Sequence, residues 1–206
     1  MSAETKTRTY RKRARAEQEE ATRVRIAEAA MELHGTVGPA RTSISAVAER
    51  AGVQRATVYR HFPTEEDLFG ACSAHWAALH PPPDISAWAE VADPGERLRA
   101  ALAALYEWYG SDTQMFVNTR RDAPLVPAMA KPVQAGREVM RAAIDALMKG
   151  RPERGHRRRR VRSAIAHATA FGTWYSLTRE GDLSDEEAIE LMLAAVTAAG
   201  RSPAAT

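Results

Sequence analysis

Apolar residues recur at helical spacing along almost the whole chain. Between residues 17 and 34, for example, Ala27, Ala30 and Met31 fall on one side of a helix. Similar spacing recurs in residues 94–110, 133–149 and 157–179 and again after Ser184, whereas no segment alternates apolar and polar residues with a period of two. The pattern therefore predicts an all-α fold of about nine helices.

Three of these helices follow one another closely in the first third of the chain. After the helix over 17–34, Thr42 or Ser43 can cap a short helix that runs to about residue 50. Gly52 then turns the chain, and a third helix is expected over about 54–61. Two short helices joined by a glycine-containing turn predict a helix-turn-helix motif.

The third helix has two chemically distinct sides. Val58 and Phe62 can pack inward together with Val53. A helix that enters the major groove needs a polar, uncluttered outer face, and Arg, small methyl-bearing residues, Tyr and His suit base edges and phosphates. We therefore expect DNA contacts, rather than an ordinary polar surface, from the outer residues Arg55, Ala56, Thr57, Tyr59, Arg60 and His61.

A fourth helix is expected to link two domains. Thr64 and Asp67 form a capping-box pattern at its start, and the prolines at 81–83 end it after about Leu79. The expected organisation is a disordered basic arm over 1–16, a helix-turn-helix domain over 17–63 and a helical effector-binding and dimerisation domain over 64–206.

Positive charge is concentrated beside the helix-turn-helix. Residues 1–62 contain 12 Lys and Arg against 7 Asp and Glu, whereas the remaining residues contain 17 against 19. The segment 5–15 has six cations and no acid, so we expect Arg11 and Arg13 to contact DNA from a disordered arm, the alternative being a solubilising tail. The second basic cluster, 156–162, is more typical of a solvated helix end than of another nucleic-acid site.

Composition narrows the class of protein. Cys72 is the single cysteine among 206 residues, which fits a reducing cytoplasm. The chain has no apolar run as long as a membrane span and no apolar segment of a secretory signal near residue 1. It also lacks the motifs of hydrolytic and metal enzymes, so we expect no catalytic residues, cofactor, metal or membrane partner.

Residues 22–70 resemble the DNA-binding domain of the TetR family of transcriptional regulators. The matching pieces are I-x-x-A-A-x-x-L over 26–33, TSISAVAERAGV over 42–53, TVYRHF over 57–62 and E-x-L-F over 66–69. The resemblance implies base contacts from Arg55, Ala56 and Tyr59, backbone contacts from Thr57, Arg60 and His61, and approach to the groove by Ser43 and Ser45.

Two residues depart from the usual pattern of that family. His34 stands where a Phe is usual at the end of the first helix, and we expect a satisfied histidine at the edge of a core. Glu65 stands where a Lys usually contacts phosphate at the start of the fourth helix. Because a carboxylate repels phosphate, we expect that contact to be absent, with the arm before residue 16 compensating.

The same resemblance implies a small-molecule pocket in the C-terminal domain. An apolar lining with a few polar groups is typical of such pockets, although aromatic and methionine residues also fill ordinary cores. The candidates for binding a small apolar or aromatic effector are Trp108, Met115, Phe116, Met140, Phe171 and Trp174, with Asn118 and His167 as polar groups.

The last two helices are the expected homodimer surface. A dimer suits a palindromic operator because two reading helices then meet two half-sites about 34 Å apart. The residues expected there, some of which an internal core must claim, are Ile165, Ala168, Thr169, Gly172 and Ser176 on the first helix and Ile189, Met192, Leu193, Val196 and Ala199 on the second.

Together these observations predict a sequence-specific regulator that binds double-stranded DNA. The favoured hypothesis is a repressor that a small effector releases from its operator, because dimerisation alone needs fewer residues than the C-terminal domain contains. The alternatives are an architectural DNA-binding protein without a ligand and an activator.

Overall fold

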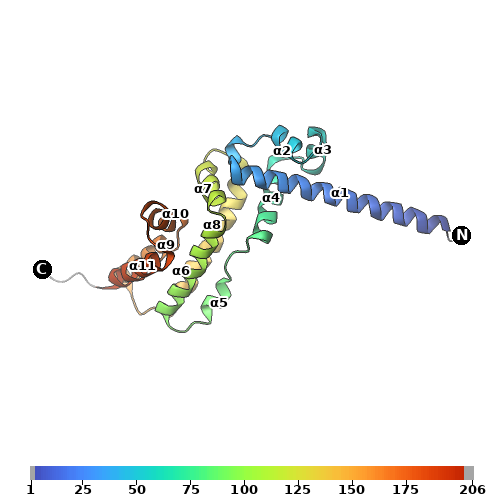
Figure 1. Cartoon of the computed structure of the whole chain (residues 1–206). Helices are drawn as coiled ribbons and strands as arrows, with labels where there is room; N and C mark the ends of the chain where they lie inside the picture. The colour runs from blue at the N-terminus through green and yellow to red at the C-terminus, as the bar shows by residue number, and fades with distance from the viewer. Residues whose placement is uncertain (1–2, 202–206) are drawn as a thin grey trace. The chain divides into compact units, whose positions relative to one another are not determined.

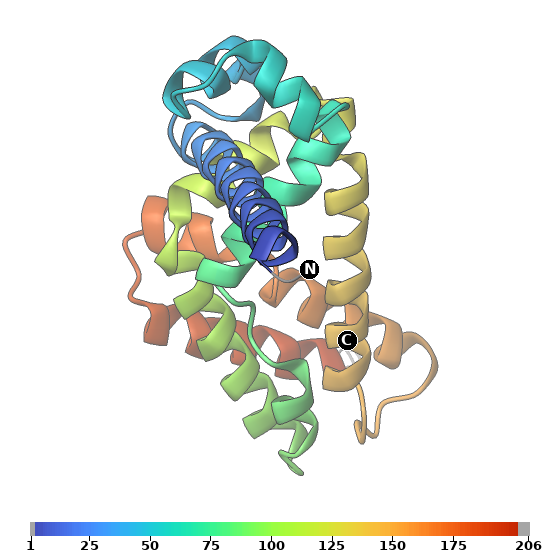
Figure 2. The same cartoon turned by 90° about the vertical axis from the view of Figure 1, so that its right-hand side faces the viewer.

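A computed structural model describes the backbone of residues 3–201 (Figures 1 and 2). Eleven α-helices and no strand occur between Ala3 and Arg201, against the nine or so helices that the sequence predicts. The chain divides into two compact units. The N-terminal unit comprises residues 1–79 and 117–133, and the C-terminal unit comprises residues 80–116 and 134–206.

The N-terminal unit contains the expected helix-turn-helix. Its helices form because apolar residues face a shared interior, where Ile26, Ala30, Val47, Val58 and Phe62 are almost fully buried. Its elements are α1 (Ala3–Thr36), the 3-10 helix η1 (Pro39–Arg41), α2 (Ile44–Arg50), α3 (Arg55–His61), α4 (Glu65–Leu79), the second half of α7 (Thr113–Asp122) and the 3-10 helix η2 (Pro127–Met129).

The unit is therefore larger than the domain expected over 17–63. It includes all of α4, which ends at Leu79, and the segment 117–133 from far along the chain. Residues from α4, Leu68 and Cys72, belong to the same buried cluster as Val58. The sequence could not indicate this arrangement, because capping signals give the ends of a helix and not its packing partners.

The first helix is longer than expected. It begins at Ala3 rather than near residue 17, so the structure describes a helix in the segment for which the sequence predicts a disordered arm. The segment is rich in Ala, Arg and Lys, which favour helices. Pairs at i,i+4 add support, because Arg13 Nε lies 2.9 Å from Glu17 and Arg15 Nε lies 3.2 Å from Glu19.

The capping signals in the sequence have mixed outcomes. Ser43 caps α2 by accepting from the Ala46 N–H at 3.2 Å, and Ser184 forms a full capping box with Glu187. Thr64 and Asp67 also bond reciprocally at the start of α4. Ser111 does not cap α7, because its hydroxyl donates to the Trp108 carbonyl, and the Asp112 carboxylate accepts from the Met115 N–H at 3.3 Å instead.

The C-terminal unit is a helical bundle around one apolar core. Large fully buried side chains such as Tyr106, Leu147, Ile165 and Trp174 occupy its centre. Its elements are α5 (Ile85–Ala89), α6 (Pro94–Ser111), the start of α7, most of α8 (Ala130–Leu147), α9 (Gly155–Ala168), α10 (Phe171–Tyr175), the π-helix η3 (Ser176–Glu180) and α11 (Asp185–Gly200).

The single long helix expected over 157–179 is divided in the structure. Ala170 has an extended backbone, with φ −80° and ψ 135°, between α9 and α10. At the end of α9, the Thr169 hydroxyl donates to the Ile165 carbonyl at 2.9 Å, and such back-bonding disfavours a straight continuation. None of the helices within residues 3–201 combines the length and apolar character that a membrane span needs.

His34 is a buried polar group in the core of the N-terminal unit. Its ring stacks on Phe69 with centroids 4.7 Å apart, and Nδ1 lies 3.6 Å from the Cys72 sulfur. Burial lowers the pKa of His34 to about 4, with the Asp122 carboxylate acting in the opposite direction. The same burial raises the pKa of the Cys72 thiol to about 12, so this cysteine is a packed thiol rather than a reactive one.

We expect acid to destabilise the N-terminal unit through His34. Between pH 6.5 and about 4 the unfolded histidine binds a proton that the folded one does not, so the free energy of unfolding falls as the pH drops through this window. The loss approaches about 3 kcal/mol at the lower end. Urea unfolding of the variant His34→Phe across the window should show a weaker pH dependence, whereas exposed His156→Phe should not. Equal slopes for both variants and the unsubstituted chain would contradict this assignment.

Candidate DNA-binding surface and effector site

The turn between α2 and α3 fixes how α3 leaves the core. Gly52 has a φ of +65°, a conformation that a side chain disfavours. Its N–H donates to the Glu49 carbonyl at 3.1 Å, and the next N–H, that of Val53, donates to the Ala48 carbonyl at 2.9 Å. These hydrogen bonds end α2, and α3 begins at Arg55, three residues after Gly52.

Only one side of α3 is used for packing. Val58 is fully buried and Phe62 is 2% exposed, and the Arg23 guanidinium lies over the Phe62 ring at 5.1 Å from its centroid. Tyr59, by contrast, is 46% exposed. The remaining predicted residues of this helix lie around it, with Arg55, Ala56 and Arg60 exposed and Thr57 and His61 half-buried.

The structure brings residues of α2 and α3 together around one hollow of about 290 Å³. Its apolar floor includes Ile44, Val47 and Leu68. The polar residues that line it are Ser43, Ser45, Arg55, Tyr59 and Glu65. We call Ser43, Ser45 and the outer residues of α3 (Arg55, Ala56, Thr57, Tyr59, Arg60 and His61) the reading surface.

Polar side-chain pairs connect α2 and α4 to α1. Arg50 at the end of α2 lies 2.6 Å from Glu32, and His75 of α4 lies 3.5 Å from Glu28. Both pairs are partly exposed, so their contribution to stability is small compared with burial of the apolar faces. They orient α2 and α4 along α1 without entering the core.

Asn118 is wrongly placed among the effector residues. It belongs to the N-terminal unit, where it is fully buried and its amide donates to the carbonyls of His34 at 2.9 Å and Gly35 at 3.0 Å. These carbonyls end α1 and have no partner within the helix, so the amide caps them. A lone Asn on an apolar helix face is the sequence signal that could have indicated such a role.

Asp122 extends the same attachment and was missed from the sequence. One carboxylate oxygen accepts from the Ala40 N–H at 3.0 Å, and the Arg121 guanidinium pairs with both oxygens. The hydrogen bond from Arg121 is the main cause that lowers the pKa of Asp122. Gly38, with a φ of +95°, must be glycine here, because a Cβ would collide with Arg121 and Asp122. The second half of α7 thus secures the loop that leads to α2.

The basic arm differs from the expected disordered tail. Arg13 lies on α1, is exposed and pairs with Glu17. The Arg11 side chain lies outside the described residues. DNA contact from this segment remains a prediction. The side chains that would make the contact lie on α1.

Four of the predicted effector residues lie in one aromatic cluster of the C-terminal unit. Trp108 meets Phe116 edge-on at 4.8 Å between centroids, and Phe116 stacks on Phe171 at 5.2 Å. Phe171 lies 5.6 Å from Trp174. Tyr109, which the sequence-based list omits, contacts all four of these rings. Its hydroxyl donates to the Thr169 carbonyl at 2.7 Å, and burial raises the pKa of this hydroxyl.

The other residues predicted to bind an effector in this unit do not form part of the aromatic cluster. Met140 packs against the core of the C-terminal unit, and Met115 is half-buried at the start of α7. His167 is exposed, with its ring nitrogens 3.3 and 3.4 Å from the Thr173 hydroxyl. Trp174 is fully buried and donates to Asp185 at 2.8 Å, so it serves the core as it stands.

The residues expected at a dimer surface are partly used inside the chain. The structure buries Ile165, Ala168, Thr169, Ile189, Met192 and Val196 in the C-terminal unit. The periodicity correctly identified an apolar face on each helix, but that face packs within the chain. A partner can only meet the opposite face of α9 and α11.

Glu65 is expected to weaken DNA binding. Its carboxylate is exposed at the edge of the hollow beside Arg55 and Tyr59, where it repels an approaching phosphate. The variant Glu65→Lys should bind DNA more tightly, with a log–log salt slope steeper by about one to two. Fluorescence anisotropy over a salt series measures both quantities, and Glu66→Lys, exposed but outside the hollow, is the matched control. An unchanged slope for Glu65→Lys would place phosphate elsewhere.

Comparison with known proteins agrees with the geometry. Residues 26–72 match the tetR family of bacterial regulatory proteins, and this match spans α2 and α3. No curated protein gives a significant sequence match.

Solved structures share the fold over most of the chain. A TetR-like transcriptional regulator from Rhodococcus sp. RHA1 is 18% identical with a TM-score of 0.62, covering 86% of this chain and 95% of its own. NalD of Pseudomonas aeruginosa, the secondary repressor of the MexAB-OprM multidrug efflux pump, is 20% identical with a TM-score of 0.63, covering 89% and 97%. The multidrug-binding protein EbrR is 22% identical with a TM-score of 0.55, covering 88% and 90%. Residues 26–72 are therefore similar to the tetR family of bacterial regulatory proteins, and the helical fold of the chain is similar to that of TetR-like transcriptional regulators.

Proposed function

We propose that this protein is a repressor that binds a palindromic operator as a homodimer and is released by a small apolar or aromatic effector. The observation that carries the proposal is the two-sided α3, whose Val58 and Phe62 are buried while Tyr59 and Arg55 remain exposed. Only the side chains of Val58 and Phe62 are buried here, whereas most of the other residues of α3 carry hydrogen-bonding groups. This composition favours a helix that contacts a polar partner over an ordinary surface helix. In the cytoplasm, DNA is the partner that such a face fits.

Each part of the reading surface has a distinct role in this proposal. Arg55 and Tyr59 contact base edges, and Ala56 offers its methyl group to thymine. Thr57, Arg60 and His61 contact the phosphate backbone and so fix the position of α3. Ser43 and Ser45 approach the groove from the start of α2, where Ser43 also caps that helix.

Effector control is supported by the aromatic cluster around Phe116 and Phe171. Edge-to-face and stacked rings form the apolar environment that a small hydrophobic or aromatic molecule prefers. Two proteins that share the fold are described as a repressor of an efflux pump and as a multidrug-binding protein. The similarity to these two proteins favours control by a small molecule in this chain as well.

Helix α7 offers a physical route from effector to DNA. Phe116 on this helix belongs to the aromatic cluster, and Asn118, two residues later, caps the end of α1. An effector that moves Phe116 strains the bonds of Asn118 and Asp122, which hold the loop leading to α2. By linkage, DNA then weakens effector binding by the same factor.

A ligand-independent architectural protein and an activator are the alternative proposals. The aromatic cluster disfavours the architectural alternative only if it opens to admit a molecule. An activator would share the reading surface and differ only in its effect on transcription. The two tests below separate DNA recognition from effector control.

DNA recognition is tested with the DNA upstream of the protein's own coding sequence. We expect specific binding in a gel shift, and Tyr59→Ala should weaken it by roughly ten- to a hundredfold because one base-reading side chain is lost. Val139→Ala, which removes an exposed apolar side chain from the C-terminal unit, is the control and should leave DNA binding unchanged. Sedimentation should show an unchanged oligomer. If Tyr59→Ala dissociates the oligomer, then Tyr59 is structural rather than a DNA contact.

Effector control is tested by adding small apolar and aromatic compounds to the protein–DNA complex. A true effector should release the DNA and change tryptophan fluorescence, because Trp108 lies in the aromatic cluster. Phe116→Ala should raise the effector concentration required by about tenfold or more, whereas exposed Val139→Ala should not. Release that is equally efficient in Phe116→Ala would argue against this cluster as the effector site.

A further inference from the structure

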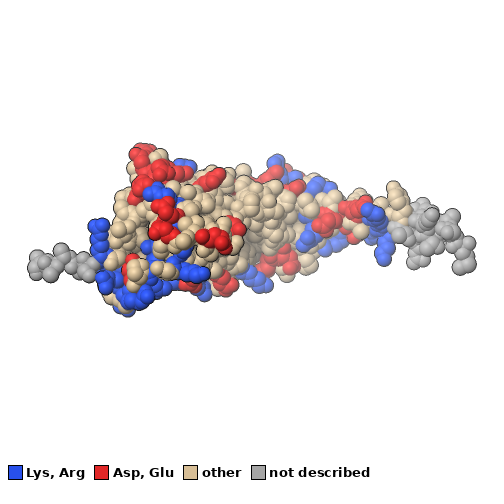
Figure 3. All heavy atoms as spheres, turned by 90° about the horizontal axis from the view of Figure 1, so that it is seen from below, with Lys and Arg blue, Asp and Glu red and all other residues tan. Residues whose placement is uncertain are grey.

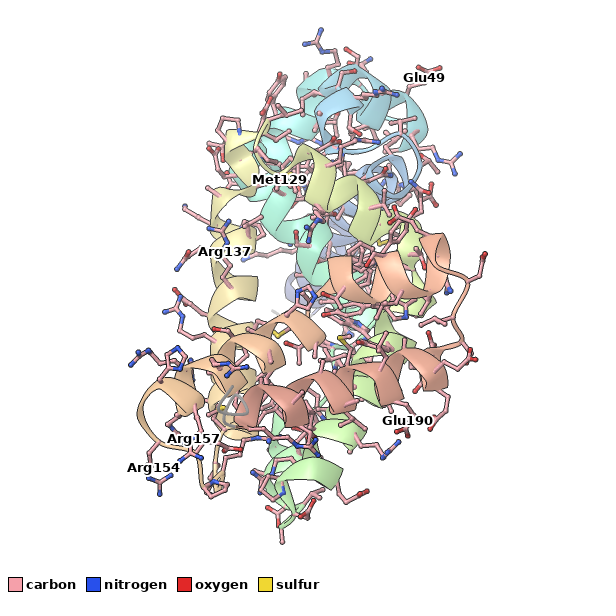
Figure 4. The ribbon with its side chains drawn as sticks, turned by 90° about the vertical axis from the view of Figure 1, so that its left-hand side faces the viewer. Glu49, Met129, Arg137, Arg154, Arg157 and Glu190 are labelled. Carbon is pink, nitrogen blue, oxygen red and sulfur yellow. The ribbon has the colours of Figure 1, made fainter. Side chains whose placement is uncertain are left out.

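A second hollow, of about 360 Å³, lies at the loop that joins α8 to α9 in the C-terminal unit. Four cationic side chains line it, and no acid of the described chain does. Figure 4 shows Arg154 and Arg157 beside this loop, and Arg137 near the other end of α8. We call it the basic hollow, after its cationic lining residues Lys149, Arg151, Arg154 and Arg158.

Buried hydrogen bonds hold the loop of the basic hollow in one shape. Arg97 is 4% exposed, and its guanidinium donates to the Lys149 carbonyl at 2.6 Å and to three other carbonyls. Arg151 donates to the Pro94 carbonyl at 2.9 Å. Gly150 turns the chain with a φ of +77°, which a side chain disfavours. The cations are therefore placed by the fold and not by a flexible loop.

The charge of the basic hollow is poorly compensated within the chain. Its four cations form no ion pair with a carboxylate in the described part of the chain. Burial lowers the pKa of Arg151, and Arg97 acts in the same direction, whereas the carboxylates of Asp93 and Glu153 oppose this shift. Glu153, the single acid of the loop 148–154, is directed elsewhere, since a Cβ placed on Gly200 would lie 3.0 Å from its Oε1.

Arg154 presents an open edge of its guanidinium. Its Nη1 donates to the carbonyls of Arg151, Pro152 and Glu153 at 3.1, 2.9 and 3.0 Å. Its Nε and Nη2 make no hydrogen bond within the described residues. These two nitrogens carry parallel N–H groups, which match two oxygens of one phosphate. Arg158, half-buried four residues later on the same side of α9, adds a second guanidinium.

The start of α9 adds to the same positive field. Its N-cap residue is Arg154, whose side chain makes no capping hydrogen bond, so the first N–H groups of the helix are left for other acceptors. Arg157, Arg159 and Arg160 follow and are exposed. In Figure 3, Lys and Arg gather over one edge of the end that carries the C-terminus. This contribution is small beside the formal charges of the lining residues.

We propose that the basic hollow binds a small multivalent phosphate anion, namely a diphosphate group that is either free or part of a nucleotide. Its volume of about 360 Å³ is near the lower end of the range of ligand pockets, roughly 300–1,000 Å³. Phosphate oxygens accept from Arg154 and Arg158, while Lys149 and Arg151 supply further positive charge. The site shares no residue with the reading surface or the aromatic cluster, so this ligand is additional to DNA and to the effector.

A small anion suits the basic hollow better than a DNA duplex does. A duplex distributes its phosphates along each strand, about one per 3.4 Å of helix axis, and so favours cations in a row on an outward surface. The four cations here instead surround a recess, and Arg151 and Arg158 are half-buried. Such an arrangement concentrates charge on one compact ligand.

Isothermal titration calorimetry of the full-length chain with sodium pyrophosphate tests the proposal. At constant ionic strength we expect binding to the unsubstituted chain. Arg154→Ala combined with Arg158→Ala should raise the dissociation constant by about tenfold or more, because charge-assisted hydrogen bonds are lost. A parallel titration with adenosine diphosphate distinguishes the two sources. Tighter binding than that of pyrophosphate assigns the site to a nucleotide, and equal or weaker binding assigns it to the free anion.

Controls separate loss of the site from loss of the fold. Arg137→Ala with Arg141→Ala removes the same charge from exposed positions of α8 outside the basic hollow and should leave binding unchanged. Arg154 also holds three carbonyls of the loop, so thermal unfolding must show that the double variant is folded. Arg158→Ala alone removes a side chain without a hydrogen bond in the described part of the chain, and it should still weaken binding by about threefold or more.

Three results would overturn the proposal. The first is that pyrophosphate does not bind the unsubstituted chain. The second is that the folded variant at Arg154 and Arg158 binds pyrophosphate as tightly as the variant at Arg137 and Arg141. The third comes from a gel shift with the upstream DNA, which the hollow variant should bind normally. If that variant loses DNA affinity and keeps its affinity for pyrophosphate, the cations serve the DNA backbone instead.

Discussion

The burial of Val58 and Phe62 is the interaction on which the reading surface depends. Helix α3 has only seven residues, and an isolated helix of that length is unstable in water. It forms because one side is packed against residues of α1, α2 and α4, including Ile26, Val47 and Leu68. That packing uses a narrow stripe, so Arg55, Tyr59 and Arg60 remain free to meet a partner.

A second constraint comes from polar groups that the fold must satisfy. The carbonyls at the end of α1 are buried, and an unpaired buried carbonyl is costly. Asn118 donates to two of them, and Asp122 accepts from the Ala40 N–H a few residues later. The helix that supplies these groups also carries Phe116 of the aromatic cluster. In the proposed mechanism, a requirement for stability and a route for control thus lie on one helix.

Unfavourably placed charges occur at two places in this chain. Glu65 brings a negative charge to the hollow beside Arg55 and Tyr59, which makes the proposed phosphate contacts depend on the other cations nearby. On α9, Arg157 to Arg160 stand where the helix dipole disfavours them.

Most of the helices and the reading surface could be predicted from the sequence. Apolar spacing, the Gly52 turn and the caps at Ser43, Thr64 and Ser184 are local signals, and local hydrogen bonds and helix geometry are enough to realise them. The two sides of α3 follow from the same periodicity. The family resemblance then predicted which side faces DNA.

Only the tertiary structure decided which polar and apolar groups meet across long separations. The sequence pattern made Asn118 look like an effector contact, whereas the fold buries its amide against the end of α1, 83 residues away from Gly35. Likewise, periodicity showed that α9 and α11 each have an apolar face but could not show that these faces pack together within the chain. Helical spacing specifies a face, and the partner of that face is chosen by packing of the whole chain.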